Sequence, residues 1–424
     1  MKDTIAPPKE VLKRNNEVQN FEPENITKAI LKAAKEIDKD NSIDVVEVVD
    51  EVIGNVSINT INEETILTVD EIHKVVEDTL MDLKYFDIAR AYIGYRKTHK
   101  PDIFKERLNY KPFEYPKLNE YVDAIQQSYW IVSEFNFSSD IQDYKSELTV
   151  EEKEAVKRSM LAISQVEVAV KNFWGKIVDR IPKPEIQEVG AVFAESEVRH
   201  SKAYAQLLEY LGLNSEFETV LEVPSIKKRV DYAQKALSKS KTDSNQDYLE
   251  SVLLFSLFIE NVSLFSQFLI ISQMNKERAV LSGMSNVISA TSLEENLHSD
   301  FGSEVVNVIR TEHPEWFTDD LTERIQRLVW QAFEAEKAIV DWIFEEGDLP
   351  YLSKNEVIEY IKNRFNSGLE QSGFNKVFQI DETLLENTRW FDVQNNVTMH
   401  TDFFAKRPVN YTKFSQSFSE DDLF

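Results

Sequence analysis

The pattern of apolar and polar residues divides the chain into a short region and a long one. In the short region, a polar, hairpin-like stretch begins near Val11 and leads into amphipathic helical stretches at 26–37 and 69–83. From Leu118 to about Glu386, Leu, Val, Ile, Phe and Ala recur at i, i+3, i+4 spacing, with few glycines and no strand-like alternation of comparable length. We therefore predict a small domain followed by a large helical bundle, and a mainly α fold.

A proline-punctuated segment separates the two regions. Pro101, Pro112 and Pro116 interrupt the pattern, and proline both disfavours helix continuation and stiffens a connection. After Trp390 the periodicity is lost, and the last seven residues form an acidic stretch with apolar residues at both ends, which we expect to order on a partner. The predicted organisation is a small domain over 1–100, a linker over 101–117, the bundle over 118–386 and a flexible tail over 387–424.

Composition excludes several classes of function. The 48 basic residues against 74 acidic ones give a net charge of −26, which would repel nucleic acid. The chain has no cysteine, so disulfides, zinc-thiolate sites and iron–sulfur clusters are excluded, and it has no phosphate-binding P-loop motif. No apolar run approaches the roughly 20 residues that span a bilayer, and the first residues lack a signal-peptide pattern. We expect a cytoplasmic protein that binds neither nucleic acid nor membrane.

Two E-x-x-H motifs stand out in the bundle. Glu197 precedes His200 by three residues and Glu295 precedes His298 by the same interval, so each pair lies one helical turn apart on one face. One such motif alone is more often a solvated helix face in a chain this acidic. Two of them in one bundle instead predict a shared metal site.

Two further glutamates lie in strongly apolar helical stretches. Glu167 follows Ile163-Ser164-Gln165-Val166, and Glu260 follows Leu257-Phe258-Ile259. Burying an unpaired carboxylate is costly, so these surroundings call for a cation. Together with the two motifs, the glutamates give the ligand set of the ferritin-like di-iron and di-manganese carboxylate proteins. Oxygen and imidazole ligands suit iron or manganese better than a metal that prefers thiolates.

Further residues occupy characteristic positions around these motifs. Tyr204 follows His200 by four residues, Trp130 lies upstream of Glu167, and Tyr411 ends the stretch F-F-A-K-R-P-V-N-Y. In these features the chain, from about Trp130 to its C-terminus, resembles the small subunit of class I ribonucleotide reductases. The resemblance implies a radical-bearing tyrosine at Tyr204, a radical-transfer route through Trp130 and Tyr411, a homodimer, and docking of the terminal D-D-L-F on a large subunit.

The missing cysteines fit this resemblance. In that family, ribose reduction proceeds through a cysteine radical and a reducing cysteine pair, neither of which this chain can supply. The resemblance therefore implies that the chain activates an oxygen species at its metals, stores the oxidising equivalent and passes it to a separate large subunit.

The chain departs from most of the family at two positions. Glu167 stands where most members have an aspartate, which resembles the subgroups with manganese-containing centres, so we expect two manganese ions rather than two irons or a mixed manganese–iron pair. In those subgroups the oxidant resides on the metals, which leaves the radical role of Tyr204 open. Glu294 stands where relatives commonly have an aspartate that hydrogen-bonds the tryptophan and histidine of the transfer route.

The first region resembles the ATP-cone, a small α/β regulatory module. Val11-Leu12-Lys13-Arg14-Asn15-Asn16 corresponds to its opening pattern and the stretch 89–97 to its closing helix. We expect ATP or dATP to bind there and dATP to promote higher oligomers. The residues predicted to contact nucleotide are Lys13, Arg14, Lys28, His73, Arg96 and Lys97. The motif Asp70-Glu71-Ile72-His73 has metal-ligand spacing but no partner carboxylates in apolar helices, so we reject it as a metal site.

Two other functions remain open at this stage. A ferritin-like oxygenase or oxidase would act on its own small substrate, and Trp130, Tyr411 and the tail would then have no purpose. A metal-storage or nucleotide-sensing protein would bind its ligands without redox output.

Overall fold

The computed structural model describes residues 8–12, 18–62, 66–98 and 101–394, without the side chains of 58–62, 95–98, 167–170 and 236. The chain divides into two compact units, Met1–Asp102 and Ile103–Phe424. Each has its own hydrophobic core. The units are described separately below.

In its described residues, the first unit combines one hairpin with four helices. Strands β1 (Glu10–Leu12) and β2 (Val18–Asn20) pair antiparallel, and Leu12 also forms a parallel bridge with Thr68. Thr68 starts the third helix through a capping box with Glu71, which satisfies backbone donors at that end. The helices are α1 (Pro23–Glu36), α2 (Val45–Asn62), α3 (Val69–Asp82) and α4 (Phe86–Thr98), with a 3₁₀ turn η1 (Asp40–Ser42) after α1. The two helical stretches predicted from the sequence correspond to α1 and α3.

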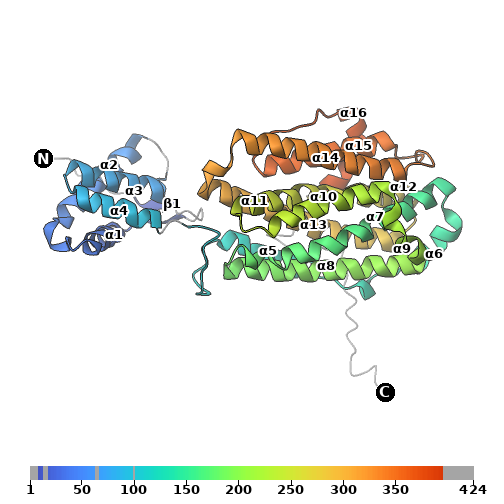
Figure 1. Cartoon of the computed structure of the whole chain (residues 1–424), viewed down its shortest axis with the longest axis horizontal. Helices are drawn as coiled ribbons and strands as arrows, with labels where there is room; N and C mark the ends of the chain where they lie inside the picture. Colours follow the sequence, from blue (N-terminus) through green and yellow to red (C-terminus); the bar gives the residue numbers. More distant parts are fainter. Residues whose placement is uncertain (1–7, 13–17, 63–65, 99–100, 395–424) are drawn as a thin grey trace, which may run out of the picture. The chain divides into compact units, whose positions relative to one another are not determined.

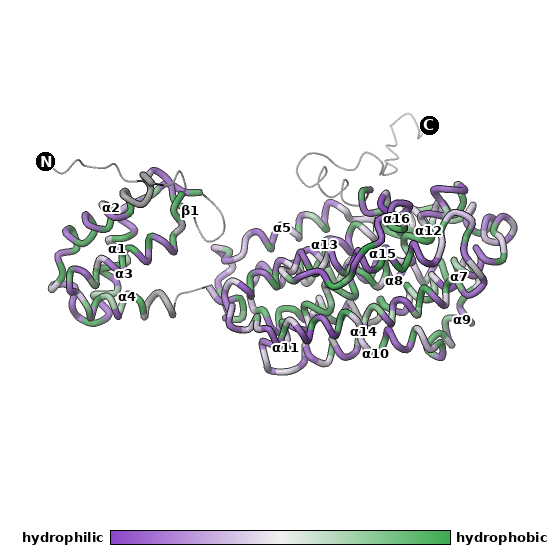
Figure 2. Tube along the Cα trace, turned by 90° about the horizontal axis from the view of Figure 1, so that it is seen from above, coloured by the Kyte–Doolittle hydropathy of each residue, from purple (hydrophilic) through white to green (hydrophobic). Residues whose placement is uncertain are grey.

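The second unit is a bundle of long helices that lie side by side (Figure 1). Apolar and polar residues alternate along each helix (Figure 2), so the helices bury one face, or all faces at the centre. The long helices are α5 (Pro116–Gln127), α7 (Val150–Trp174), α8 (Pro184–Leu211), α10 (Pro224–Ser240), α11 (Asn245–Leu254), α12 (Phe265–Arg278), α13 (Ser282–Glu312), α14 (Asp319–Ile343) and α15 (Lys354–Gln371). The short elements are α6 (Ser138–Gln142), α9 (Asn214–Glu218), α16 (Glu382–Leu385), the 3₁₀ turns η2 (Val132–Glu134), η4 (Ile177–Asp179), η5 (Val220–Glu222), η7 (Pro314–Trp316) and η8 (Glu386–Thr388), and the π-helices η3 (Asp143–Glu147) and η6 (Phe255–Ser263). The prediction of a mainly α protein is confirmed.

One helix at the centre of the bundle is apolar on every side. Residues Asn245–Arg278 run through α11, η6 and α12, and among the described residues this segment is long and apolar enough to cross a membrane. The sequence analysis did not recognise such a segment. Its apolar window is completely buried inside the unit, as in the core helix of a soluble protein.

Two glycines let neighbouring helices approach the π-helix closely. A Cβ atom at Gly302 of α13 would lie 1.7 Å from Oγ of Ser256, and one at Gly368 of α15 would lie 2.5 Å from Nδ2 of Asn261. Any larger residue at either position would push the helices apart. The π-helical segment is therefore held at a fixed depth between α13 and α15.

The start of α13 is fixed by acidic side chains from α6 and η3. Oδ1 of Asp140 accepts a hydrogen bond from the backbone N–H of Gly283 at 3.0 Å, and its Oδ2 accepts one from Met284. Oδ2 of Asp143 accepts from the N–H of Leu281 at 2.9 Å. Carboxylates at a helix N-terminus satisfy free N–H groups and favour the helix dipole. These contacts fix the position of a helix that carries one E-x-x-H motif.

The chain remains packed against the bundle beyond residue 387, where the flexible tail was predicted to begin. Residues 389–394 are helical. Nε1 of Trp390 donates to Oε1 of Gln273 at 2.5 Å, and Phe391 is buried in the bundle core. Two adjacent aromatic side chains bury enough apolar surface to hold this segment. The rest of the predicted tail lies outside the described residues.

Candidate metal centre

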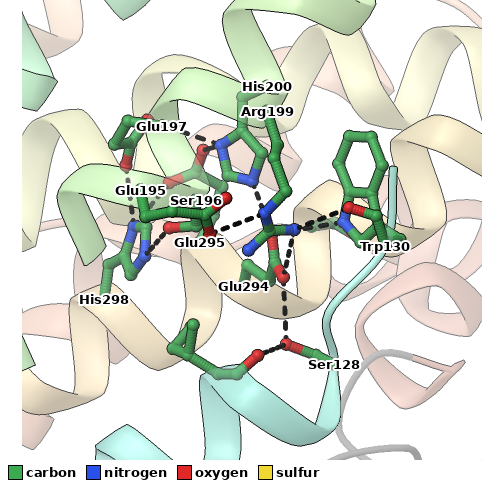
Figure 3. Close-up of polar contacts among 12 residues, drawn as sticks. Ser128, Trp130, Glu195, Ser196, Glu197, Arg199, His200, Glu294, Glu295 and His298 are labelled. Carbon is green, nitrogen blue, oxygen red and sulfur yellow. Dashed lines mark hydrogen bonds and ion pairs between the residues drawn. The ribbon is translucent and has the colours of Figure 1, made fainter. Parts of the chain in front are cut away.

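Acidic and histidine side chains from three helices meet in the middle of the bundle. Glu197 and His200 come from α8, Glu295 and His298 from α13, and Glu260 from the π-helix η6. All five are at most 1 % exposed. The three-residue spacing places both members of each E-x-x-H motif on the inner face of its helix, as Figure 3 shows. Glu167 lies in α7, but its side chain is outside the described residues.

The potential ligand atoms of these residues point toward one another. Nδ1 of His200 is 3.1 Å from Oε1 of Glu295 and 3.4 Å from Oε2 of Glu197. Nδ1 of His298 is 2.9 Å from Oε1 of Glu197 and 3.6 Å from Oε2 of Glu260. One atom each from Glu197, Glu260, Glu295 and His298 lie within 4.8 Å of one another, a spacing that fits a metal ion.

The hydrogen bonding of the cluster fits a cation at its centre. Both carboxylate oxygens of Glu197 and Glu295, Oε2 of Glu260 and Nδ1 of both histidines have no hydrogen-bond partner among the described residues. Buried polar atoms of this kind are costly unless something binds them. Five carboxylate oxygens and two ring nitrogens around one space form a donor set suited to iron or manganese.

The outer atoms of the same side chains are held in place. Nε2 of His200 lies 2.7 Å from Oε2 of Glu294, and Nε2 of His298 lies 3.0 Å from Oγ of Ser196. Nε1 of Trp174 donates to Oε1 of Glu260 at 2.6 Å. With a metal bound, each ring would keep its proton on Nε2 and turn the lone pair of Nδ1 inward, the arrangement that metal-binding histidines adopt.

Burial and mutual repulsion perturb the acids and bases of the cluster. Burial, with the neighbouring Glu295, raises the pKa of Glu260 well above its ordinary value. Burial opposes protonation of His200 and His298, but their contacts with Glu197 and other carboxylates outweigh it, and both histidine pKa values are raised. Protons therefore compensate the negative charge in this form of the site, and a divalent cation would take their place.

Glu294 links the cluster to Trp130. Its Oε2 lies 3.2 Å from Nε1 of Trp130 and 2.7 Å from Nε2 of His200, and its Oε1 accepts from Oγ of Ser128 at 3.0 Å (Figure 3). The rings of Trp130 and His200 also stack, with centroids 5.9 Å apart and planes inclined by 12°. Both Trp130 and Glu294 are buried. A glutamate at this position thus reaches both partners, in one chain of contacts from a cluster histidine to the tryptophan.

Arg199 completes this connection, and the sequence analysis did not single it out. Its Nη1 lies 3.0 Å and 3.2 Å from the two carboxylate oxygens of Glu294, and its guanidinium carbon lies 5.4 Å from the ring centre of Trp130. Burial lowers the pKa of Arg199, but Glu294 and Glu195 outweigh this effect and raise it. In the sequence, Arg199 is a basic residue inside an E-x-x-H motif. A basic residue in that position is equally consistent with a solvent-exposed helix face, so the sequence alone did not identify it.

The remaining predicted redox residues are placed only in part. Tyr204 is buried on α8, one turn beyond His200. Tyr411 lies outside the described residues.

The predicted nucleotide-binding residues are also placed only in part. Lys28 is exposed on α1, and Nδ1 of His73 on α3 lies 2.7 Å from the hydroxyl of Tyr92 on α4. Lys13 and Arg14 lie outside the described residues, as do the side chains of Arg96 and Lys97.

The bundle and its buried cluster define a ferritin-like carboxylate protein with a metal-binding site. Residues 107–386 match the family model of the ribonucleotide reductase small chain, and residues 9–101 match that of the ATP cone domain. The chain belongs to the ribonucleotide reductase small chain family and carries an N-terminal ATP-cone domain. Both family predictions are thereby confirmed.

Individual relatives agree with this assignment. A probable ribonucleoside-diphosphate reductase small subunit of Invertebrate iridescent virus 3 is 23 % identical over 328 residues, which are 74 % of this chain and 86 % of the relative. The dimanganese(II)-NrdF of Streptococcus sanguinis has a TM-score of 0.58 at 14 % identity, covering 69 % of this chain and 99 % of that one. An R2-like ligand-binding oxidase with a Mn/Fe cofactor has a TM-score of 0.55 at 20 % identity, covering 62 % and 95 %. These two structures show the ferritin-like fold alone.

Proposed function

We propose that this chain is the radical-generating subunit of a class I ribonucleotide reductase. Two metal ions are held by the six predicted ligands, namely Glu167, Glu197, His200, Glu260, Glu295 and His298. When bound, the metals supply the one-electron oxidation chemistry that produces and stores an oxidising equivalent. That equivalent passes to a large subunit, which reduces ribonucleotides to deoxyribonucleotides. The observation that carries this proposal is the chain of contacts from His200 through Glu294 to Trp130.

The residues around the cluster have separate roles in the transfer. Trp130 gives up an electron toward the cluster, and its Nε1–H then becomes strongly acidic. Oε2 of Glu294 lies 3.2 Å away and can accept that proton. Arg199 balances the charge of Glu294 in a region from which water is excluded. Trp130 and Glu294 thus move an electron and a proton together, so that neither of them is left charged, and Arg199 keeps its ion pair with Glu195.

Manganese is the metal that we favour. The ligand set contains four glutamates and two histidines, which are hard and borderline donors. The resemblance at Glu167 supports two manganese ions over two irons or a mixed manganese–iron pair. With manganese the oxidant resides on the metals, and Tyr204 then has no necessary radical role.

The partner of this chain is the large subunit. Because the chain contains no cysteine, the thiol chemistry of ribose reduction must occur elsewhere. We propose that Tyr411 continues the route from Trp130 and that the acidic C-terminal residues dock on the large subunit. The working form is a homodimer, and the compartment is the cytoplasm.

The N-terminal domain supplies the regulation. We propose that residues 1–100 bind ATP or dATP through Lys13, Arg14, Lys28, His73, Arg96 and Lys97, that 101–117 is a linker, and that dATP drives the dimer into less active higher oligomers. Deleting residues 1–100 should leave metal binding intact and abolish inhibition by dATP. Inhibition that persists in the truncated protein would contradict this assignment.

One sample of aerobically matured protein can test both the identity of the metals and the location of the oxidant. We expect a low-temperature electron paramagnetic resonance spectrum of aerobically matured protein to show a multiline manganese signal and about two metals per chain. A tyrosyl signal would place the radical on Tyr204 instead. Mononuclear or empty sites without an oxidised signal would contradict the proposal.

The Trp130→Phe variant tests whether the oxidant leaves the chain. It should keep the oxidised metal signal and lose nucleotide reduction in a mixture with the large subunit. If the chain were instead an independent oxidase, substrate oxidation would be unchanged in this variant and in one without the last residues. The match to the small-chain family over 107–386 favours the reductase.

A further inference from the structure

Arg364 of α15 contacts the residues that directly follow two of the proposed metal ligands. Its Nε donates to the backbone oxygen of Asn261 at 2.8 Å, and Nδ2 of Asn261 donates back to the carbonyl oxygen of Arg364 at 2.7 Å. Its Nη2 donates to Oδ1 of Asn296 at 3.0 Å. Asn261 follows Glu260 and Asn296 follows Glu295. One guanidinium group therefore joins η6 and α13 beside their ligand residues.

The surroundings of Arg364 make this junction rigid. Arg364, Asn261 and Asn296 are all less than 9 % exposed, and the guanidinium carbon lies 3.6 Å from the ring centre of Phe265. One turn further along α15, Gly368 allows the close approach to Asn261. A buried arginine is costly, and an apolar side chain would fill the same space more cheaply. Its hydrogen bonds therefore point to a role in position rather than in packing.

The same guanidinium group also reaches the last described segment. Nη1 of Arg364 lies 3.4 Å from Oδ1 of Asp392, which also accepts a hydrogen bond from the hydroxyl of Tyr360 at 2.9 Å. Asp392 belongs to the helical stretch 389–394, which is held on the bundle by Trp390 and Phe391. The ligand-bearing helices and this stretch thus share one arginine.

We propose that Arg364 is a positioning residue that sets the separation of the Glu260 and Glu295 carboxylates and couples metal binding to the segment 389–394. The inference rests on the proposed metal site. Glu260 and Glu295 would both hold the metal and lie on η6 and α13, so metal binding would act on the separation of these two elements. Because Arg364 is bonded to both helices, it moves with them and changes its contact with Asp392.

Manganese(II) binding to the full-length protein tests the positioning role. Arg364→Met keeps the side-chain volume and removes every donor, and we expect the dissociation constant for Mn²⁺ to rise by about 10–100-fold, as when an outer partner of a metal ligand is lost. Arg158→Met is the matched control: Arg158 of α7 is equally buried and pairs with Glu154 and Glu346. It should change the affinity less than about threefold. Equal affinities in the wild type and Arg364→Met would overturn the proposal.

Hydrogen exchange tests the coupling. Mn²⁺ should slow amide exchange in residues 385–394 of the wild type, and this response should be absent in Arg364→Met. Asp392→Asn, a change at the edge of the bundle, should keep the Mn²⁺ affinity and weaken the response. An exchange response that is the same in all three proteins would overturn the coupling.

Two further outcomes are distinguishable. If Arg364→Met does not fold, Asn296→Ala can be tested instead, because it removes one hydrogen-bond partner of Arg364. We expect Mn²⁺ affinity to fall in this variant too, but by less. An unchanged affinity would contradict the proposal. A wild-type protein that binds no Mn²⁺ would refute the proposed metal site itself. If the wild type binds Mn²⁺ and the variants bind it equally well, only the role of Arg364 is refuted.

Discussion

Replacing Gly302 with alanine should destabilise the bundle and weaken the metal site together. The new Cβ would lie 1.7 Å from Oγ of Ser256 and 2.7 Å from its Cβ. The hydroxyl can rotate away, but the Cβ of Ser256 is fixed to the backbone and falls 0.7 Å short of the 3.4 Å at which ordinary contact begins. Therefore α13 and η6 must separate. Ser256 lies one turn before Glu260 and Gly302 one turn after His298, so the separation acts on both ligands.

The expected size follows from two opposing effects. Overpacking in a core costs about 1–3 kcal/mol. Replacing glycine by alanine inside a helix stabilises it by about 1 kcal/mol. The net loss should be about 0–2 kcal/mol, a decrease in melting temperature of about 1.5 °C per kcal/mol for a unit of this size. The dissociation constant for Mn²⁺ should rise by about tenfold.

Matched variants separate the clash from a general glycine effect. A Cβ at Gly54 of α2 meets nothing within 4 Å, so Gly54→Ala should stabilise the first unit by about 0.5–1 kcal/mol. In the Gly302→Ala background, Ser256→Gly should restore Mn²⁺ affinity, whereas Ser256→Ala should not, because it keeps the Cβ. Calorimetry and Mn²⁺ titration of these four variants and the wild type check this. If Gly302→Ala melts above the wild type and binds Mn²⁺ equally well, the close approach of the two helices is not what holds the site.

Other contacts lead to three further predictions. Glu294→Gln should retain the metals, measured by elemental analysis, and lose at least about tenfold in nucleotide reduction, because a neutral amide is a poor acceptor for the Trp130 proton and its NH2 group would face the donor of Arg199; unchanged turnover would exclude Glu294 from the route. Trp174→Phe removes the donor to Oε1 of Glu260, so Mn²⁺ affinity should fall about tenfold, and an unaltered titration would count against the contact. Asp140→Ala leaves the N–H groups of Gly283 and Met284 without their carboxylate acceptor. We expect the free energy of unfolding, measured by chemical denaturation, to fall by about 1–3 kcal/mol. An unchanged free energy of unfolding would contradict this role of Asp140.

The sequence predicted those parts of the site that depend on local spacing. The three-residue interval within each motif determines which side chains share a helix face, whatever the rest of the fold does. Glu260 was recognised because its apolar neighbours made exposure costly, and the structure places it in the same cluster. The long amphipathic stretches likewise predicted the helices of the bundle, because burial of one face repeats along each of them.

Contacts between distant segments could not be predicted in this way. Trp174 reaches Glu260 across 86 positions, Arg199 reaches Glu294 across 95, and Arg364 reaches Asn261 across 103. In the sequence alone, each of these residues fits an ordinary role equally well, as a core aromatic or a surface cation. The π-helical turn that carries Glu260 has no sequence pattern of its own, because its i to i+5 bonds depend on packing from α13 and α15. The packed stretch 389–394 was missed because two aromatic residues are too few for a periodicity.

The contacts of Glu294 also define its role at the start of the proposed transfer. Four groups approach its two oxygens, namely Ser128, Trp130, Arg199 and His200. The N–H groups of Trp130 and Arg199 can only donate, so Glu294 accepts from both. Glu294 is therefore placed beside Arg199 as the acceptor that receives the Nε1 proton when Trp130 is oxidised. The longer acidic side chain fits this role because Arg199, from the helix that carries His200, fixes both oxygens at once.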